Sequence, residues 1–151
     1  MNCFFKKFSF LLSSGLFILN TINVNANAIN IDPFNWSKPY EKYGGCLTVA
    51  DSPQLKKELA YVLIVGDATR HILFMKINGK LRSFSVVEKD ISSDKYFYRW
   101  NFDGYNAEMY KTQKIQTHLE SDSSSTQGIL HIYSSKYNYS KLIKVSIRTA
   151  C

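Results

Sequence analysis

From residue 46 onward, apolar and polar residues alternate with a period of two, and turn-forming residues interrupt the alternation at short intervals. This pattern is typical of antiparallel β-strands and predicts an all-β fold. The segment 141–151 is the clearest case, because Ile143, Val145 and Ile147 alternate with cationic and polar residues. The segment 58–65 is instead continuously apolar, which favours a strand buried on both faces, although periodicity alone also fits a buried helix.

The turns place two hairpins in register. Asn78-Gly79 is a strong signal for a two-residue hairpin turn. Counting outward from it predicts three cross-strand pairs, which are Met75 with Arg82, Leu73 with Phe84, and His71 with Val86.

The second hairpin contains "KYFYRWNF" (95–102), in which five aromatic residues stand among two cations. Its turn, Asp103-Gly104, predicts the pairs Phe102–Tyr105, Asn101–Asn106, Trp100–Ala107, Arg99–Glu108, Tyr98–Met109 and Phe97–Tyr110. Tyr96, Tyr98, Trp100 and Phe102 then share the core face of the sheet. Phe97 lies beside Tyr110 on the charged face, and we treat these two residues as candidate binding residues.

Two later segments, 114–120 and 128–134, flank the polar stretch "SDSSSTQ", which reads as a loop. A symmetric pairing around that loop predicts Leu119 opposite Leu130 and Thr117 opposite Ile132. It also places His118 beside His131 on the other face.

Cys46 opens the first strand of the pattern, and Cys151 shares the inward face of the last one. We expect a Cys46–Cys151 disulfide, which joins the first and last strands. Eight strands in meander order with joined ends predict a small antiparallel barrel, closed or flattened. A two-sheet β-sandwich is the alternative fold.

The N-terminus has the form of a secretory signal peptide. Lys6 and Lys7 precede a short apolar run over 8–19, and a small-x-small motif ends at Ala28. We expect cleavage after Ala28, an irregular lead-in over 29–45 and a β domain over 46–151. The chain is then exported to the periplasm or secreted, and its mature part contains no transmembrane segment.

Removal of the leader lowers the formal net charge from +7 to +5, which favours acidic partners. A protein or an anionic glycan of the cell envelope fits this charge, whereas nucleic acid is not expected outside the cell. Aromatic residues make up 15% of the chain, and such rings offer large contact areas for recognition. The loop "SSKYNYSK" therefore adds four candidate binding residues, which are Lys136, Tyr137, Tyr139 and Lys141.

Motifs for catalysis are scarce. The three histidines have no metal-binding spacing, so we predict neither a metal nor a cofactor. No G-x-S-x-G motif is present either. One catalytic alternative is a small secreted hydrolase, similar to a nuclease, in which His118 and His131 act as acid and base.

The export signal, the single β meander and the terminal cysteine paired with the first strand resemble the architecture of the small periplasmic lysozyme inhibitors. Residues 29–151 lack the inhibitory loop signatures of that group, so the resemblance assigns no site residue. We expect a non-enzymatic binding protein, such as an inhibitor or an immunity-type protein. A structural component of the envelope is a further alternative.

Overall fold

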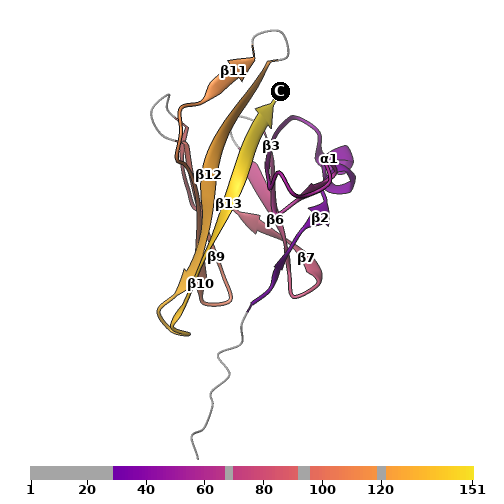
Figure 1. Ribbon diagram of the computed structural model, residues 1–151. Helices are drawn as coiled ribbons and strands as arrows, with labels where there is room; N and C mark the ends of the chain where they lie inside the picture. Colours follow the sequence, from indigo (N-terminus) through magenta and orange to yellow (C-terminus); the bar gives the residue numbers. More distant parts are fainter. Residues whose placement is uncertain (1–28, 67–69, 92–95, 119–121) are drawn as a thin grey trace, which may run out of the picture.

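The computed structural model describes residues 29–66, 70–91, 96–118 and 122–151 (Figure 1). The predicted signal peptide and its cleavage site after Ala28 lie outside these residues. One helix, α1 (Ser37–Tyr43), accompanies thirteen strands in the described ranges. The strands are β1 (Ile31–Asp32), β2 (Phe34–Asn35), β3 (Cys46–Asp51), β4 (Leu59–Ala60), β5 (Val62–Gly66), β6 (His71–Ile77), β7 (Lys80–Ser85), β8 (Glu88–Ile91), β9 (Tyr96–Phe102), β10 (Tyr105–Lys111), β11 (Gln116–His118), β12 (Ser123–Ser134) and β13 (Tyr139–Ala150).

Eleven strands form one antiparallel sheet, and the fold is all-β as predicted. The main path of the sheet is β1-β6-β5-β3-β13-β12-β10-β9-β8, with β7 paired to β6 and β11 paired to β12. Strands β2 and β4 form a separate two-stranded sheet. The pairing of β13 with β3 confirms that the first long strand and the last one lie side by side.

The prediction of a closed barrel with eight strands is wrong, because the sheet stays open between β7 and β8. Within the described residues, β7 pairs only with β6 and β8 pairs only with β9, so the two edges do not meet. Only Val86 and Val87 connect these strands. A two-residue hairpin needs positive φ angles, which β-branched residues avoid, so the chain does not turn back on itself there. The strand count is higher than predicted because several short segments also pair.

Side chains bridge the two halves of the curled sheet near this opening. The ring centroids of Phe84 in β7 and Phe102 in β9 are 5.4 Å apart. Arg82 in β7 forms an ion pair with Asp103, which lies in the turn after β9. The halves are therefore joined by side chains where a closed barrel would have backbone hydrogen bonds.

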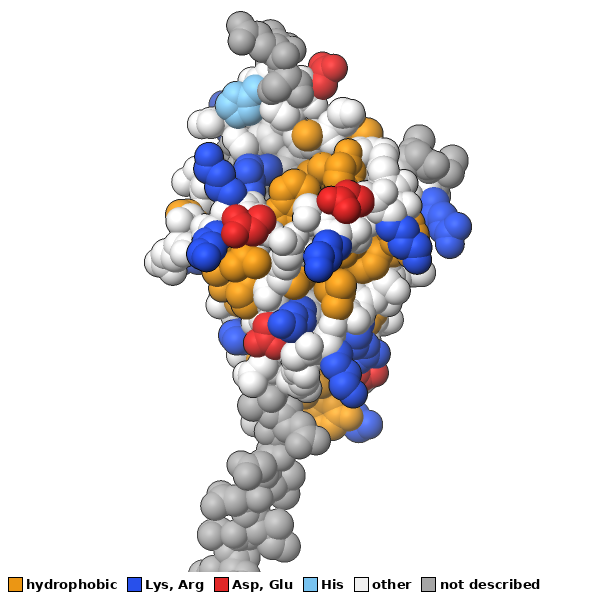
Figure 2. All heavy atoms as spheres, turned by 90° about the vertical axis from the view of Figure 1, so that its right-hand side faces the viewer, with side chains coloured by type: hydrophobic (Ala, Val, Ile, Leu, Met, Phe, Trp, Pro, Cys, Tyr) orange, Lys and Arg blue, Asp and Glu red, His pale blue; other side chains and the backbone are white. Residues whose placement is uncertain are grey.

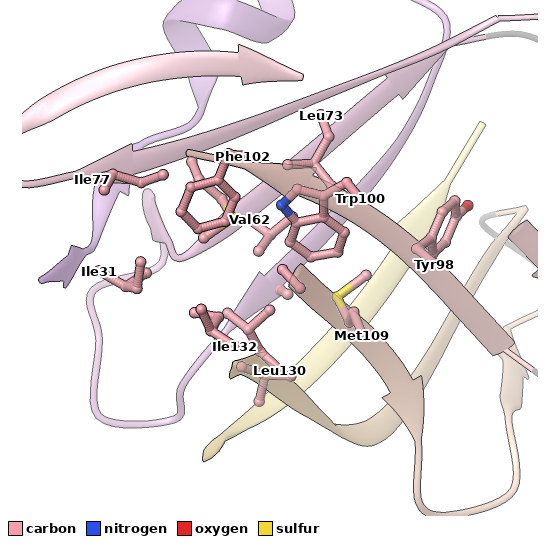
Figure 3. Packing of buried hydrophobic residues seen from close by; sticks show 14 of the residues in the cluster. Ile31, Val62, Leu73, Ile77, Tyr98, Trp100, Phe102, Met109, Leu130 and Ile132 are labelled. Carbon is pink, nitrogen blue, oxygen red and sulfur yellow. The ribbon is translucent and has the colours of Figure 1, made fainter. Parts of the chain in front are cut away.

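The main core fills the inside of the bend, and Figure 3 shows its centre. Trp100 of β9 is fully buried there and lies between residues of both halves of the sheet. The residues labelled in Figure 3 are Ile31, Val62, Leu73, Ile77, Tyr98, Trp100, Phe102, Met109, Leu130 and Ile132. As predicted, Tyr98, Trp100 and Phe102 point into this core. Nothing is described of the Tyr96 side chain.

A second, smaller core covers the outer face of β3, β5 and β6. It consists of Phe34, Val49, Ala60, Leu63, Val65 and Phe74, with Trp36, Tyr40, Leu47 and Ile72 at its margin. Strand β5 contributes to both cores, since Val62 and Ile64 point inward while Leu63 and Val65 point outward. The predicted strand with two buried faces is confirmed.

The segment 29–45, which we expected to be irregular, covers this second core. It contains β1, β2 and α1, and Phe34 from β2 is buried against the outer face of the sheet. Figure 2 shows this side of the molecule, where lysine and arginine side chains are scattered between apolar patches.

Both hairpin predictions hold at the level of single residues. Six cross-strand pairs between β9 and β10 occur as predicted, from Phe102–Tyr105 to Phe97–Tyr110. The pairs Met75–Arg82 and Leu73–Phe84 also form, whereas the β6–β7 pairing ends at Ile72–Ser85, before Val86. Positive φ angles at Asn78, Gly79, Asp103 and Gly104 give both turns the form that suits a two-residue hairpin.

The predicted register around "SDSSSTQ" is wrong, because most of that stretch belongs to β12. Thr117 pairs with Ser124 instead of Ile132, and His118 pairs with Ser123. Leu119 lies outside the described residues. Strand β12 extends over the serines because β13 pairs with it along its whole length, from Ser123–Ala150 to Ser134–Tyr139.

The Cys46–Cys151 disulfide is present and joins the outer ends of β3 and β13. Replacing both cysteines by serine should lower the free energy of unfolding by about 4 to 5 kcal/mol, because the bond closes a loop of 105 residues. Urea unfolding of the two proteins, each measured with and without reductant, checks this value. Equal stabilities under oxidising conditions would contradict the structural role of the bond.

The bridge between Arg82 and Asp103 predicts a pH dependence of stability. The hydrogen bond from Arg82 lowers the pKa of Asp103 in the folded protein. The ion pair therefore stabilises the fold fully above the ordinary carboxyl pKa of about 4, and this stabilisation is lost as the pH falls through the lowered pKa. The side chains of Arg82 and Asp103 are 39% and 59% exposed, so water screens the pair and we expect Asp103→Asn to cost less than about 1 kcal/mol at pH 7. Asparagine tolerates the positive φ angle of 48° at this position. Urea unfolding should show a lower free energy of unfolding for Asp103→Asn than for the wild type at pH 7, and equal values near pH 2. A difference that persists near pH 2 would contradict the ion pair as its cause and point to backbone strain.

Candidate functional site

The outward surface of β9, β10, β12 and β13 carries three rows of side chains. We call this surface the open face. Its rows, read across the strands, are Phe97–Tyr110–Ile129–Lys144, Arg99–Glu108–His131–Leu142 and Asn101–Asn106–Tyr133–Ser140. None of these side chains belongs to either core. No element of the described residues covers this surface, whereas α1 and β2 cover the outer face on the other half of the sheet.

Arg99 organises the charges of the open face. Its guanidinium group donates to Glu88 of β8 at 2.7 Å and to Glu108 of β10 at 3.0 to 3.1 Å. It also lies 5.1 Å from the ring centroid of Phe97. Because two carboxylates surround one guanidinium, this part of the face has no excess positive charge. The predicted pairing of Arg99 with Glu108 is confirmed.

Glu108 also binds the next strand. The hydroxyl of Tyr133 donates to Oε1 of Glu108 at 2.8 Å, and this hydrogen bond raises the pKa of Tyr133. His131 stacks on the Tyr133 ring with 4.7 Å between centroids, and its Nε2 lies 3.0 Å from the hydroxyl of Ser140. Polar contacts thus link β8, β9, β10 and β12 in one chain.

The first two sequence-predicted binding residues lie where they were expected. Phe97 and Tyr110 face each other across β9 and β10 on the open face, and both are half-buried. Leu142 is 62% exposed and completes the apolar part of the face with Ile129. Our sequence reasoning missed both of these residues. The alternation of β13 could have found Leu142, because it places this residue on the same side as Lys144 and Arg148.

The other four predicted residues form no part of the open face. Tyr137 stacks on Tyr105 with 5.1 Å between centroids, and Tyr139 meets the same ring edge-on at 5.5 Å. Both tyrosines pack against the main core, and burial raises the pKa of Tyr139. They close one end of the core, while Lys136 lies 5.0 Å from the Tyr137 ring centroid. Lys141 lies apart from them, beside a groove next to β13.

The two histidines of the catalytic alternative are far apart. His118 pairs with Ser123, whereas His131 lies eight residues further along β12, which corresponds to roughly 25 Å at the usual rise of a strand. Nε2 of His118 is 3.2 Å from the hydroxyl of Ser125 instead. One phosphate cannot contact both imidazoles at this separation.

The described part of the chain holds no group of three or more His, Cys, Asp or Glu side chains placed to bind a metal ion. It also contains no helix that is long and apolar enough to cross a membrane.

The Tyr133–Glu108 contact gives a prediction for the open face. In Glu108→Gln the negative charge beside the phenol is lost, so the pKa of Tyr133 should fall toward the ordinary value of about 10. Titration of the tyrosine ring carbons by NMR measures this pKa. Tyr139 serves as the internal control, because burial and not Glu108 raises its pKa. An unchanged Tyr133 together with an unchanged Tyr139 would contradict the proposed link.

Comparisons with known proteins give no relative from which a role could be transferred. No family model matches the chain, and neither the curated proteins nor the solved structures contain a match.

Proposed function

We propose that the mature chain is an exported, non-enzymatic binding protein whose open face holds a partner protein of the cell envelope. The observation that carries this proposal is the difference between the two outer faces of one sheet. One face is covered by α1 and β2, whereas the other leaves Phe97, Tyr110 and Leu142 uncovered. Apolar and aromatic side chains gathered on an uncovered surface are typical of a protein-binding site.

A protein partner fits the open face better than an anionic glycan does. A polyanion requires several free cations, but Arg99 is neutralised by Glu88 and Glu108, which leaves Lys144 as the other cation of the three rows. Aromatic and aliphatic side chains around an arginine that is already held by two carboxylates resemble the centre of a protein interface. An inhibitor or an immunity-type protein would use such a rigid, preorganised surface, because little conformational entropy is lost on binding.

The disulfide and the leader support export. Disulfides persist in oxidising compartments, and residues 1–28 have the composition of a secretory signal. The two features support export independently, because Cys46 and Cys151 both lie in the part of the chain that remains after removal of residues 1–28.

Leu142→Glu tests the proposal, because it places a charge in the open face at an exposed position. Val87→Glu is the matched control, since Val87 is also 62% exposed but lies between β7 and β8. Residues 29–151 of each variant are immobilised and used to capture proteins from an envelope extract of the source organism. We expect the wild type and Val87→Glu to retain the same partner and Leu142→Glu to lose at least about tenfold in affinity.

Two results would overturn the proposal. In one, Leu142→Glu retains the partner as well as Val87→Glu does. In the other, no protein is captured, and soluble anionic glycans bind wild type and both variants equally. Thermal unfolding of each variant shows whether a loss of binding comes from loss of the fold.

A further inference from the structure

Strand β13 is paired unequally on its two edges. On one edge, β12 pairs with all of its residues. On the other edge, β3 pairs only with residues 146–150. No described strand pairs with that second edge along 139–145. The backbone groups of this half-strand that point away from β12 therefore lack a partner strand.

A groove of about 560 Å³ lies beside this unpaired edge. Residues 141–145 of β13 form one wall, and Ile31 and Tyr61 line the groove together with residues 52–54. β3 ends at Asp51 and the chain then turns away, since Pro53 has no N–H with which to continue the sheet. The groove thus occupies the position that a longer β3 would fill.

The pairings of the neighbouring strands show that the groove is as wide as one missing strand. β5 pairs with β6 up to Met75, and β1 then pairs with Lys76 and Ile77 of β6. β7 occupies the other edge of β6, so β1 continues the row of β5. One strand position, that of β3, therefore separates β1 from the free half of β13. The hydroxyl of Tyr139 donates to the carbonyl of Ile29 at 3.3 Å and spans this gap at one end.

At another open edge of the sheet, on β7, side chains of the facing hairpin lie where an added strand would go. Arg82 and Phe84 of β7 contact Asp103 and Phe102 of the facing hairpin. These side chains occupy the space next to β7. An added strand therefore has room beside β13 but not beside β7.

The charge at the groove indicates the kind of strand that fits. Lys141 and Lys144 both line it, and no acidic side chain of the described residues does. The remaining lining is mostly apolar, including Ile31, Ile143 and Val145, with uncharged polar residues such as Ser52 and Gln54. Lys141 and Lys144 lie on opposite sides of β13, so an extended apolar segment with one acidic residue on each side would satisfy both the lysines and the apolar wall.

We propose that this groove binds an extended acidic segment of another protein, which adds to the sheet as a strand against residues 139–145 of β13. Backbone hydrogen bonds to the free edge provide affinity, and the two lysines select acidic sequences. The proposal differs from that for the open face because it uses the backbone edge of β13, although Leu142 and Lys144 belong to both surfaces.

Two libraries of synthetic peptides test the proposal. In the first, two glutamates three positions apart stand among valine, isoleucine or tyrosine, so that one glutamate lies on each side of the strand, and in the second lysine replaces glutamate. Fluorescence anisotropy with residues 29–151 measures binding up to about 1 mM peptide, the weak limit of specific recognition. Amide hydrogen exchange, read residue by residue by NMR, then locates the bound peptide. We expect binders only from the acidic library and new protection at every second amide of 139–145, because alternate amides already point to β12.

Variants and modified peptides separate strand addition from general attraction of charge. Lys141→Glu with Lys144→Glu should weaken binding about tenfold, whereas the matched pair Lys80→Glu with Lys114→Glu should not. N-methylation of alternate peptide nitrogens, on the edge that faces β13, should abolish binding without a change in charge. Tyr110→Ala, which changes the open face at a residue that does not line the groove, should leave the protection pattern in place even where it abolishes capture of an envelope partner.

Several outcomes would overturn the proposal. These are the absence of any binder, equal binding of the N-methylated peptides, or protection elsewhere than in 139–145. Sedimentation of the free protein as a dimer with those amides already protected would assign the groove to a second copy of the chain. Protection of the same amides in the full chain but not in residues 29–151 would assign it to residues 1–28.

Discussion

The antiparallel pairing of β3 with β13 is the contact on which the rest of the structure depends. It joins two segments about a hundred residues apart, and it turns a linear meander into a sheet that encloses a core. The disulfide secures the same contact at its outer end. Because β3 has six residues and β13 has twelve, the contact is also incomplete. One pairing thus determines both how the core is enclosed and where the sheet stays open.

Strand β5 shows why the two outer faces differ. Its continuous run of apolar residues must be buried on both sides, so the half of the sheet around it needs a cover. Residues 29–45 provide that cover with Phe34, Trp36 and Tyr40. Strands β9, β10 and β13 alternate, so their outward faces tolerate water and need no cover. The position of the open face therefore follows from which strands alternate and which do not.

The hairpins could be predicted to the residue, because a two-residue turn with positive φ angles determines the register of its strands. The stretch "SDSSSTQ" could not, since serine and threonine fit a loop and a strand equally well without knowledge of β13. Closure of the barrel could not be predicted either. Val86 and Val87 keep β7 and β8 from forming a hairpin, and this becomes visible only when the positions of both strands are known. At the candidate site, the register predicted Phe97 beside Tyr110 correctly. Tyr137 and Tyr139 looked like loop residues because their partner, Tyr105, lies on another hairpin.

The long sequence separation of β3 and β13 also orders the events of folding. Hairpins such as β9–β10 and β12–β13 close short loops, whereas the β3–β13 contact closes a loop of about a hundred residues and carries a larger entropic cost. Before that last contact forms, the whole length of β13 is an unpaired edge, and such an edge is a template for intermolecular association. The finished protein retains only half of this edge. The groove thus marks the part of this edge that the β3–β13 contact leaves uncovered.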